Sequence, residues 1–387
     1  MEGLSDVVAP VEQARSLPPR CYVNGRHFEW EMQGVFRSGW CGVGRVDRVA
    51  ETGTYCAFEL AGVPVLMVRD ENGELRAFSN SCRHRGMKIA ADGEGKCKTF
   101  MCPFHAWTYG LDGRLISCPR MEGVDEFSKD DYGLVPIRCE IRQGFVFLNM
   151  DGNGPDIDTW LGDFATLHAP WSLEDLVTSE RSEFDVHCNW KAVLEVFNEY
   201  YHLSAVHSDT VAGSYATPEP LDSVTGDYSS QFGAHKENAR GGILEDDRES
   251  EFPVIETLSG ATQNGTRYSW IFPSMTFAAS CDAIWVLEAY PQSPALTRVA
   301  MSVCFPQQTT ALADFAPRAA AYHRRMEAAM AEDVAILEQQ QLGLSSPLAK
   351  PGPFAPRLEA SVHAFQFWLA ERLLSLSGDP DSSDAHS

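Results

Sequence analysis

The sequence has few basic residues relative to its acidic ones. Lysine and arginine total 31 against 54 aspartate and glutamate residues, so the 387-residue chain has a formal net charge of −23. Nucleic-acid binding depends on basic side chains that neutralise phosphates, and this balance therefore argues against a nucleic-acid partner. The acidity favours a solvated surface and is compatible with a cationic substrate or partner.

Long hydrophobic runs are also missing. No stretch of about 18 consecutive apolar residues occurs, which is the minimum expected for a helix that spans a bilayer. The N-terminal residues are mixed and acidic, without the apolar segment of a secretory leader. We therefore predict no membrane association and a cytoplasmic location, in which the eleven cysteines stay reduced.

Two cysteine–histidine pairs stand out among what is present. Cys82-x-His84 is followed, after seventeen residues, by Cys102-x-x-His105. Such ligands fit a tetrahedral zinc ion, or a Rieske [2Fe–2S] cluster in which two thiolates hold one iron and two imidazoles the other. A zinc finger of this ligand type has both cysteines first and both histidines later. Here each pair has one of each, which favours the cluster over zinc.

The residues around these pairs strengthen that preference. The pattern C-x-H…C-P-x-H-x-W resembles the signature of Rieske proteins, and Gly86 and Pro103 predict that both pairs lie in loops. Ala106 replaces the glycine usual in C-P-x-H-G-W, a change that we expect to leave ligation intact. Cys97 lies between the pairs at a spacing that fits neither, and the remaining cysteines are predicted to be small buried residues.

A second candidate metal site is Glu199-x-x-His202-x-x-x-x-His207, in a predicted helical stretch. Residues three apart share a helix face, but His207 lies about 140° round the helix from His202. The helix must therefore loosen or end before His207 if both histidines bind one ion. With a carboxylate they would form the facial triad of non-haem Fe(II) oxygenases. Taken alone, the motif is better explained as an ordinary histidine pair, but a one-electron carrier upstream favours the iron site. A di-iron bundle would need two Glu-x-x-His motifs, and the single motif in this sequence therefore argues against that class of protein.

The two motifs in this order resemble the α subunit of Rieske non-haem iron oxygenases, the ring-hydroxylating family, over roughly residues 35–344. The residues that match the family pattern in the second motif are Asn189, Trp190, Lys191, Glu195, Glu199, Tyr201, His202 and His207. Val196 stands where the family often has asparagine. The resemblance places a third iron ligand at Asp333, in a late E-D…Q-x-G-L motif, with Glu332 as the alternative.

The same resemblance implies roles for neighbours and partners. Glu199 would bridge the iron ligand His202 to a cluster histidine of an adjacent subunit in a head-to-tail homotrimer, to which a small β subunit is added in part of the family. The sequence has neither a G-x-G-x-x-G fingerprint after a strand nor a C-x4-C-x2-C cluster motif. Electrons from NAD(P)H would therefore arrive through a separate flavin/iron–sulfur reductase, or through a ferredoxin and a reductase.

These features predict a terminal oxygenase that uses O2 to hydroxylate a small organic substrate. Glutamate rather than aspartate at position 199 resembles the members that act on carnitine, glycine betaine and choline, which indicates mono-oxygenation or demethylation of a quaternary ammonium compound. One alternative is the α subunit of an aromatic ring-hydroxylating dioxygenase. Two others, from different classes, are a Rieske electron carrier without oxygenase activity and a zinc-stabilised binding protein.

The apolar pattern predicts an α+β fold in two domains. A small antiparallel β Rieske domain is expected at 39–150, and a catalytic domain of the helix-grip kind, with helices on an antiparallel sheet, at 151–376. Residues 1–38 are expected to pack with the catalytic domain, and 377–387 to form a disordered tail. We further predict long loops, with a lid as one role, at 213–258. Aromatic candidates for a pocket that cages a trimethylammonium group or stacks on an aromatic ring are Phe197, Tyr200, Trp270, Phe272 and Trp285, followed by Tyr268 and Phe277.

Overall fold

The first part of the chain folds into antiparallel sheets. The computed structural model describes residues 3–208, 210–237, 239 and 242–376. A seven-stranded sheet has the order β1-β10-β9-β4-β3-β2-β5, and a small sheet has the order β6-β7-β8. Their strands are β1 Trp40–Arg45, β2 Thr54–Leu60, β3 Val63–Arg69, β4 Leu75–Ser79, β5 Gly93–Lys96, β6 Phe100–Met101, β7 Thr108–Tyr109, β8 Leu115–Ser117, β9 Pro136–Arg142 and β10 Phe145–Asn149.

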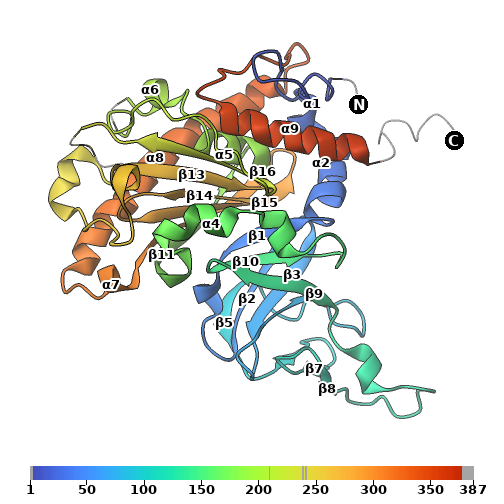
Figure 1. Ribbon diagram of the computed structural model, residues 1–387. Helices are drawn as coiled ribbons and strands as arrows, with labels where there is room; N and C mark the ends of the chain where they lie inside the picture. The colour runs from blue at the N-terminus through green and yellow to red at the C-terminus, as the bar shows by residue number, and fades with distance from the viewer. Residues whose placement is uncertain (1–2, 209, 238, 240–241, 377–387) are drawn as a thin grey trace.

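The second part is a six-stranded antiparallel sheet of order β11-β16-β15-β14-β13-β12. Its strands are β11 Leu176–Val186, β12 Tyr228–Ala234, β13 Gly265–Ile271, β14 Met275–Ala279, β15 Ile284–Ser293 and β16 Leu296–Pro306. The α-helices of the chain are α1 Arg20–Val23, α2 Gly25–Glu31, α3 Ile157–Leu161, α4 Phe164–His168, α5 Trp190–Phe197, α6 Leu203–Val206, α7 Gln307–Thr310, α8 Phe315–Leu344 and α9 Ala360–Ser375. The long helices α8 and α9 lie over one face of this sheet (Figure 1).

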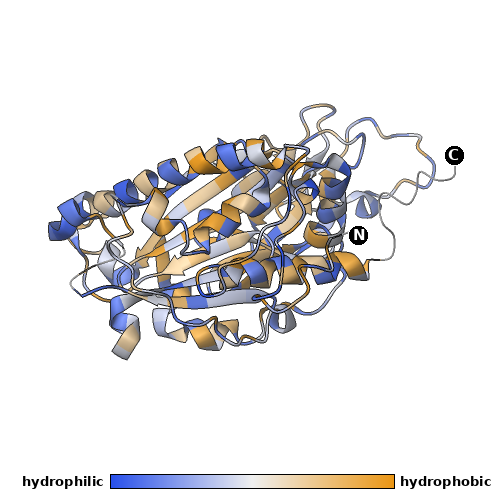
Figure 2. Cartoon of the chain, turned by 90° about the horizontal axis from the view of Figure 1, so that it is seen from above, coloured by the Kyte–Doolittle hydropathy of each residue, from blue (hydrophilic) through white to orange (hydrophobic). Residues whose placement is uncertain are grey.

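The central strands of this sheet are buried on both faces. Along β15, Trp285 and Leu287 point into the core beneath α5, α8 and α9, whereas Ile284 and Val286 point into a second core with α3 and α4. Successive side chains of a strand alternate between faces, so two cores make the strand apolar throughout. Along the long helices, hydrophilic and hydrophobic stretches alternate, as expected for helices that cover a core (Figure 2).

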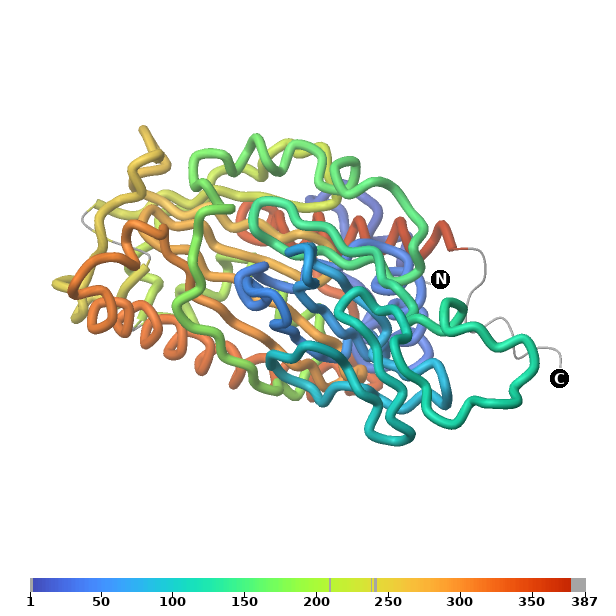
Figure 3. Tube along the Cα trace, turned by 90° about the horizontal axis from the view of Figure 1, so that it is seen from below, coloured from blue at the N-terminus to red at the C-terminus, as the bar shows by residue number. Residues whose placement is uncertain are grey.

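The seven-stranded sheet lies beneath the six-stranded one (Figure 3). Arg45, 2% exposed, donates hydrogen bonds to the carbonyl oxygens of Leu173 and Leu176 at 2.7 and 2.8 Å. The Ser274 hydroxyl donates to the Gly42 carbonyl at 2.9 Å. Hydrogen bonds between buried polar groups constrain the geometry of a contact, and these bonds therefore help to fix how the two sheets pack.

The N-terminal segment packs on the second part. Glu31 and Lys191 form an ion pair of 2.8 Å in which both side chains are fully buried. The Trp190 indole also donates to Glu31, at 3.0 Å, and the Lys191 ammonium donates to the Cys21 carbonyl. The Asn-Trp-Lys motif therefore joins the start of α5 to the N-terminal helices.

Most predicted elements are present, and the mixed helix and antiparallel-sheet class is confirmed. The interpretation of 213–258 as loops throughout is wrong, because β12 lies within it and pairs with β13 over its whole length. Strand β11 was not predicted either. The predicted tail at 377–387 lies outside the described residues.

Across the ranges that the structure describes, no helix combines the length and the apolar character needed to cross a bilayer.

Candidate metal sites

A break in the helical stretch brings the two histidines together. Helix α5 starts at the Asn189 cap, whose side chain accepts from the Lys191 amide, and it ends at Phe197. The chain then turns through Glu199 and re-enters a single helical turn, α6, directly after His202. Glu199 and His202 therefore do not share a continuous helix, and the break is what the spacing of His202 and His207 requires.

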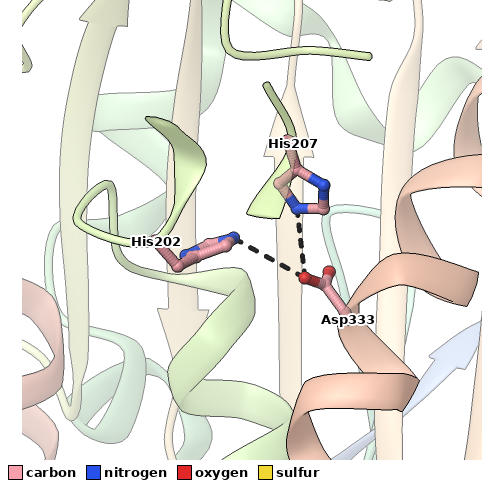
Figure 4. A group of neighbouring side chains, drawn as sticks. All are labelled: His202, His207 and Asp333. Atoms are coloured by element: carbon pink, nitrogen blue, oxygen red, sulfur yellow. Dashed lines mark ion pairs between the residues drawn. The ribbon is translucent and has the colours of Figure 1, made fainter. Parts of the chain in front are cut away.

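His202, His207 and Asp333 form one cluster, with all their ligand atoms within 4.8 Å of one another. Both imidazoles point towards the Asp333 carboxylate, which comes from α8 (Figure 4). The Asp333 Oδ1 atom is 3.1 Å from Nε2 of His207 and 3.6 Å from Nε2 of His202. The three side chains are nearly buried, so the cluster is the kind of enclosed donor set that holds a cation.

A glutamate holds the far side of each imidazole. The His202 Nδ1 atom is 2.6 Å from Oε1 of Glu199, and the His207 Nδ1 atom is 2.5 Å from Oε2 of Glu332. An ionised carboxylate can only accept hydrogen bonds, so each Nδ1 carries the hydrogen. Each Nε2 therefore presents its lone pair to the space between His202, His207 and Asp333. This tautomer is the one that binds metal through Nε2.

The donor set suits a divalent cation. The buried Oδ1 atom of Asp333 has no hydrogen-bond donor among the described residues, although two imidazole nitrogens face it. Burial opposes the charged form of His207, but the Asp333 and Glu332 carboxylates outweigh burial and raise its pKa. The group formed by His202, His207 and Asp333 thus attracts positive charge. Two imidazoles with one carboxylate also match the ligands of non-haem iron.

A small cavity of about 40 Å³ adjoins this cluster. Its lining residues are Val196, Phe197, Glu199, Tyr200, His202, Leu203, His207, Val211, Tyr215, Tyr268, Arg325, Met326, Ala329, Met330 and Asp333. Of the predicted pocket aromatics, Phe197, Tyr200 and Tyr268 contribute to it. Trp270, Phe272 and Trp285 are not among the lining residues. The first two pack on Phe365 of α9, and Trp285 is fully buried in the main core.

A larger hollow of about 420 Å³ lies on the other side of Glu199. Its polar lining includes Glu195, Glu199 and Glu359. Glu195 accepts from the Tyr22 hydroxyl and the Gln366 amide, and burial raises its pKa. Burial likewise raises the pKa of Glu359, with a smaller contribution from the Glu199 charge. Glu199 lines both the hollow and the small cavity, so it lies between them.

The two cysteine–histidine pairs lie in loops with the same hydrogen-bond pattern. In the first loop the Gly86 amide donates to the Cys82 carbonyl, and the Cys82 amide donates to the Met87 carbonyl. In the second loop Ala106 and Trp107 make the same two bonds with Cys102. The residue four after each cysteine has a positive φ, +72° for Gly86 and +58° for Ala106. Both cysteines are buried, and the rings of His84 and His105 are 4.6 Å apart.

The polar surroundings of this second group include a tyrosine. The Tyr109 hydroxyl lies 3.2 Å from Sγ of Cys82 and accepts from the Arg83 amide at 3.0 Å. Burial and the Cys82 thiol raise the pKa of Tyr109, so its hydroxyl keeps a proton to donate to sulfur. Large apolar side chains are exposed close to these loops in sequence, namely Met87, Met101, Phe104 and Ile116.

Several residues of these sites were not identified from the sequence. Arg325 and Tyr215 line the small cavity, and Glu332 holds His207 rather than competing with Asp333. Arg325 lies eight residues before Asp333 on α8. A spacing of four or eight along a helix would have placed both on one face, but charged helix residues usually face solvent.

Comparison with known proteins identifies both parts of the chain. Residues 173–375 match the ring hydroxylating alpha subunit (catalytic domain) model, and residues 39–128 match the Rieske [2Fe-2S] domain model. The glycine betaine monooxygenase oxygenase subunit of Pseudomonas aeruginosa is 25% identical over 98% of this chain and 94% of its own. The carnitine monooxygenase oxygenase subunit of Escherichia coli is 32% identical over 62% of this chain and 65% of its own. A solved quaternary ammonium Rieske monooxygenase superposes with a TM-score of 0.79 at 24% identity, over 95% of this chain and 97% of that one.

Proposed function

The chain belongs to the ring-hydroxylating oxygenase α-subunit family, and on that premise we propose that it is a terminal oxygenase that hydroxylates a small quaternary ammonium compound. The family is that of the Rieske non-haem iron oxygenases, whose cofactors are a Rieske [2Fe–2S] cluster and one mononuclear iron. The observation that carries the proposal is the convergence of His202, His207 and Asp333 on one point.

We assign the iron to those three side chains. A ferrous ion held by them would supply open coordination positions for O2 chemistry. Glu199 and Glu332 keep the two imidazoles in the orientation and tautomer that present Nε2. We assign the cluster to Cys82, His84, Cys102 and His105, whose loops bring the two imidazoles together. The Tyr109 hydroxyl, 3.2 Å from Sγ of Cys82, would donate a hydrogen bond to that sulfur once it is a thiolate ligand.

Glu199 is assigned the bridge between subunits. It contacts His202 on one side and lines the larger hollow on the other, so a group seated in the hollow meets the same carboxylate. The exposed apolar residues around the cluster loops provide a surface that a second copy would cover. This supports a head-to-tail homotrimer in which each cluster serves its neighbour, with electrons from NAD(P)H delivered by a separate reductase.

The substrate class rests on the relatives and on the cavity wall. The relatives named above act on glycine betaine and carnitine. Tyr200, Tyr215 and Tyr268 lie at ring separations of 5.6 to 6.2 Å in the cavity wall. Aromatic faces attract a trimethylammonium group by about 0.5–2 kcal/mol each. The same rings would stack on an aromatic substrate, and the substrate panel below separates these alternatives.

The test is His202→Ala in the full chain. The purified wild-type protein should be red-brown and contain about three irons and two sulfides per chain, two of the irons in the cluster. The variant should lose one iron and all turnover while its cluster absorption stays unchanged. Hydroxylation that survives the substitution would refute the assignment of the mononuclear site.

A second variant, Glu199→Gln, tests the bridge. It should keep both metals but slow single-turnover oxidation of the pre-reduced cluster, because a neutral amide cannot hold two imidazole N–H groups as a carboxylate does. Single-turnover rates equal to wild type would remove the bridging role. Uptake of O2 with reductase and NADH, measured on trimethylammonium compounds and on aromatic acids, identifies the substrate class.

A further inference from the structure

Arg325 is a buried arginine in the wall of the small cavity, and within the described part of the chain it forms no ion pair with a carboxylate. Its side chain is 6% exposed, and its Nε–H has no hydrogen-bond acceptor among the described residues. One terminal nitrogen donates to the Tyr215 hydroxyl at 3.3 Å, and the guanidinium lies 4.8 Å from the centre of the Trp285 ring. A buried charge normally has an ionic partner, because desolvation without one costs several kcal/mol.

The neighbouring pair of tyrosine hydroxyls also leaves one proton without an acceptor among the described residues. The Tyr268 and Tyr215 hydroxyls share one hydrogen bond of 2.9 Å, and Arg325 donates to the Tyr215 oxygen as well. Two hydroxyls have two protons, and one shared bond uses only one of them. Burial raises the pKa of Tyr268 well above its usual value, so it stays protonated. The cavity wall therefore offers an N–H and an O–H to a group that only accepts.

We propose that Arg325, with the Tyr215–Tyr268 pair, binds an anionic group of the substrate, specifically a carboxylate. An ionised carboxylate accepts hydrogen bonds without donating any, carries the charge that Arg325 lacks, and matches the guanidinium in shape. The proposal deepens the function proposed above, since it makes the substrate a zwitterion rather than a simple ammonium ion. It also explains a positive charge in the active site of a chain with a net charge of −23.

The helix sets the length of such a substrate. Arg325 precedes Asp333 by eight residues of α8, which corresponds to about 12 Å of helix rise. The carboxylate would therefore sit at the end of the cavity away from the iron ligands, several bonds from the carbon that is oxidised. Met326 and Met330 line the space between them. These unbranched, adaptable side chains can shift to admit a ligand larger than the present 40 Å³.

The experiment measures equilibrium binding rather than turnover. The probes are small carboxylates with and without a trimethylammonium group, each paired with its methyl ester, which keeps the skeleton and removes the negative charge. Wild type should bind each bound carboxylate about 10- to 100-fold more tightly than its ester, the range expected for hydrogen bonds to a charged group. Arg325→Gln should abolish that preference and leave ester binding within about 3-fold of wild type.

Three controls separate the roles. Arg324→Gln removes the same charge from an adjacent, half-exposed residue that pairs with Asp247, and it should change neither affinity. Arg325→Lys keeps the charge and should restore part of the preference. Unchanged ester binding in Arg325→Gln shows that the cavity remains intact, so loss of Trp285 packing cannot account for the result.

The outcomes are distinct. A carboxylate preference that depends on Arg325 for compounds with and without the ammonium group supports the anion site and removes the quaternary ammonium substrate proposed above. The same preference confined to trimethylammonium compounds supports both. Equal binding of acids and esters, a preference that survives Arg325→Gln, or no saturable binding of any carboxylate overturns the proposal.

Discussion

The Glu332 carboxylate lies on the opposite side of the His207 ring from Asp333. Its Oε2 atom is 2.5 Å from Nδ1, whereas Asp333 Oδ1 faces Nε2 at 3.1 Å. The two adjacent acids on α8 therefore have different roles. Glu332 orients the His207 ring, whereas Asp333 faces the Nε2 atoms of both histidines. Thr210 donates a further hydrogen bond to Glu332 at 2.8 Å and fixes that carboxylate.

This arrangement predicts different effects for the two acids. Asp333→Ala should remove the mononuclear iron, because a ligand is lost. Glu332→Gln should keep the iron but weaken its binding about 10- to 100-fold, as expected when the support of a ligand is removed. Titration of the iron-depleted protein with Fe²⁺ gives both affinities. If Glu332→Gln removes the iron and Asp333→Ala retains it, the two roles must be exchanged.

The cluster loops predict a pair of opposite stability changes. Ala106 and Gly86 occupy equivalent positions, each with a positive φ. A non-glycine residue in this conformation destabilises the folded protein by about 1–2 kcal/mol. Glycine avoids that strain but gives the unfolded chain more conformational entropy, which lowers the free energy of unfolding by about 0.4–1 kcal/mol. Ala106→Gly should therefore stabilise the protein by up to about 1 kcal/mol, and Gly86→Ala should destabilise it by a similar amount.

Loss of cluster absorption during denaturant unfolding reports both changes. A Cβ atom at Gly86 would meet only the Ser81 hydroxyl, at 3.8 Å, so crowding does not complicate the comparison. Changes of the same sign in the two variants would show that backbone conformation is not the cause.

A buried histidine predicts a loss of stability in mild acid. His168 lies at the end of α4, with Nδ1 2.8 Å from the Phe164 carbonyl oxygen and Nε2 2.7 Å from the Ser269 hydroxyl. Burial lowers its pKa to about 3. The unfolded chain therefore takes up a proton as the pH falls below about 6.5, whereas the folded protein does not, and folding becomes less favourable.

From pH 6.5 to 5 this one residue should cost about 2 kcal/mol of the free energy of unfolding. His168→Gln should have lower stability at neutral pH but a flatter dependence over that interval. Urea unfolding of both proteins at each pH gives the difference, in which the contributions of other groups cancel. Parallel pH profiles for the two proteins would refute a role for His168.

The Glu31–Lys191 pair predicts strong coupling between the N-terminal segment and α5. Lys191→Met leaves a buried carboxylate with only the Trp190 and His27 contacts and should destabilise the protein by about 3–5 kcal/mol. Adding Glu31→Gln removes the unpaired charge and should recover part of the loss. A double-mutant cycle by denaturant unfolding measures the coupling, and additive losses would mean that the two residues do not stabilise each other.

Local spacing was enough to predict much of this molecule. The cluster motif lies within one short segment, and β2 and β3 are short runs rich in apolar residues, as expected of buried strands. Strand β12 was missed because Ser229, Ser230 and Gln231 are polar yet at most 2% exposed. Two of them have partners that only the folded chain supplies: Arg267 donates a hydrogen bond to Ser230, and the Gln231 amide donates to the Glu219 carbonyl.

The same limit applies to the active site. His202 and His207 were identifiable from their motif, and Asp333 from a resemblance at long range. Arg325 has no sequence signal of its own, because an arginine next to Arg324 on a helix is ordinarily a surface residue. Only the packing of α8 against Trp285 and the tyrosines shows which of the two arginines faces inward.

The hydrogen bonds of Arg45 and Ser274 across the two sheets bear on what limits the speed of the catalytic cycle. A hinge between the seven-stranded and the six-stranded sheet would have to break these buried bonds in every catalytic cycle. We therefore expect the two sheets to keep this arrangement during turnover, so that in the proposed homotrimer the electron path is set by how neighbouring chains pack and not by a hinge within one chain. Any dependence of turnover on solvent viscosity should accordingly come from the encounter with the separate reductase or with the substrate, and should disappear in single-turnover oxidation of the pre-reduced protein with bound substrate.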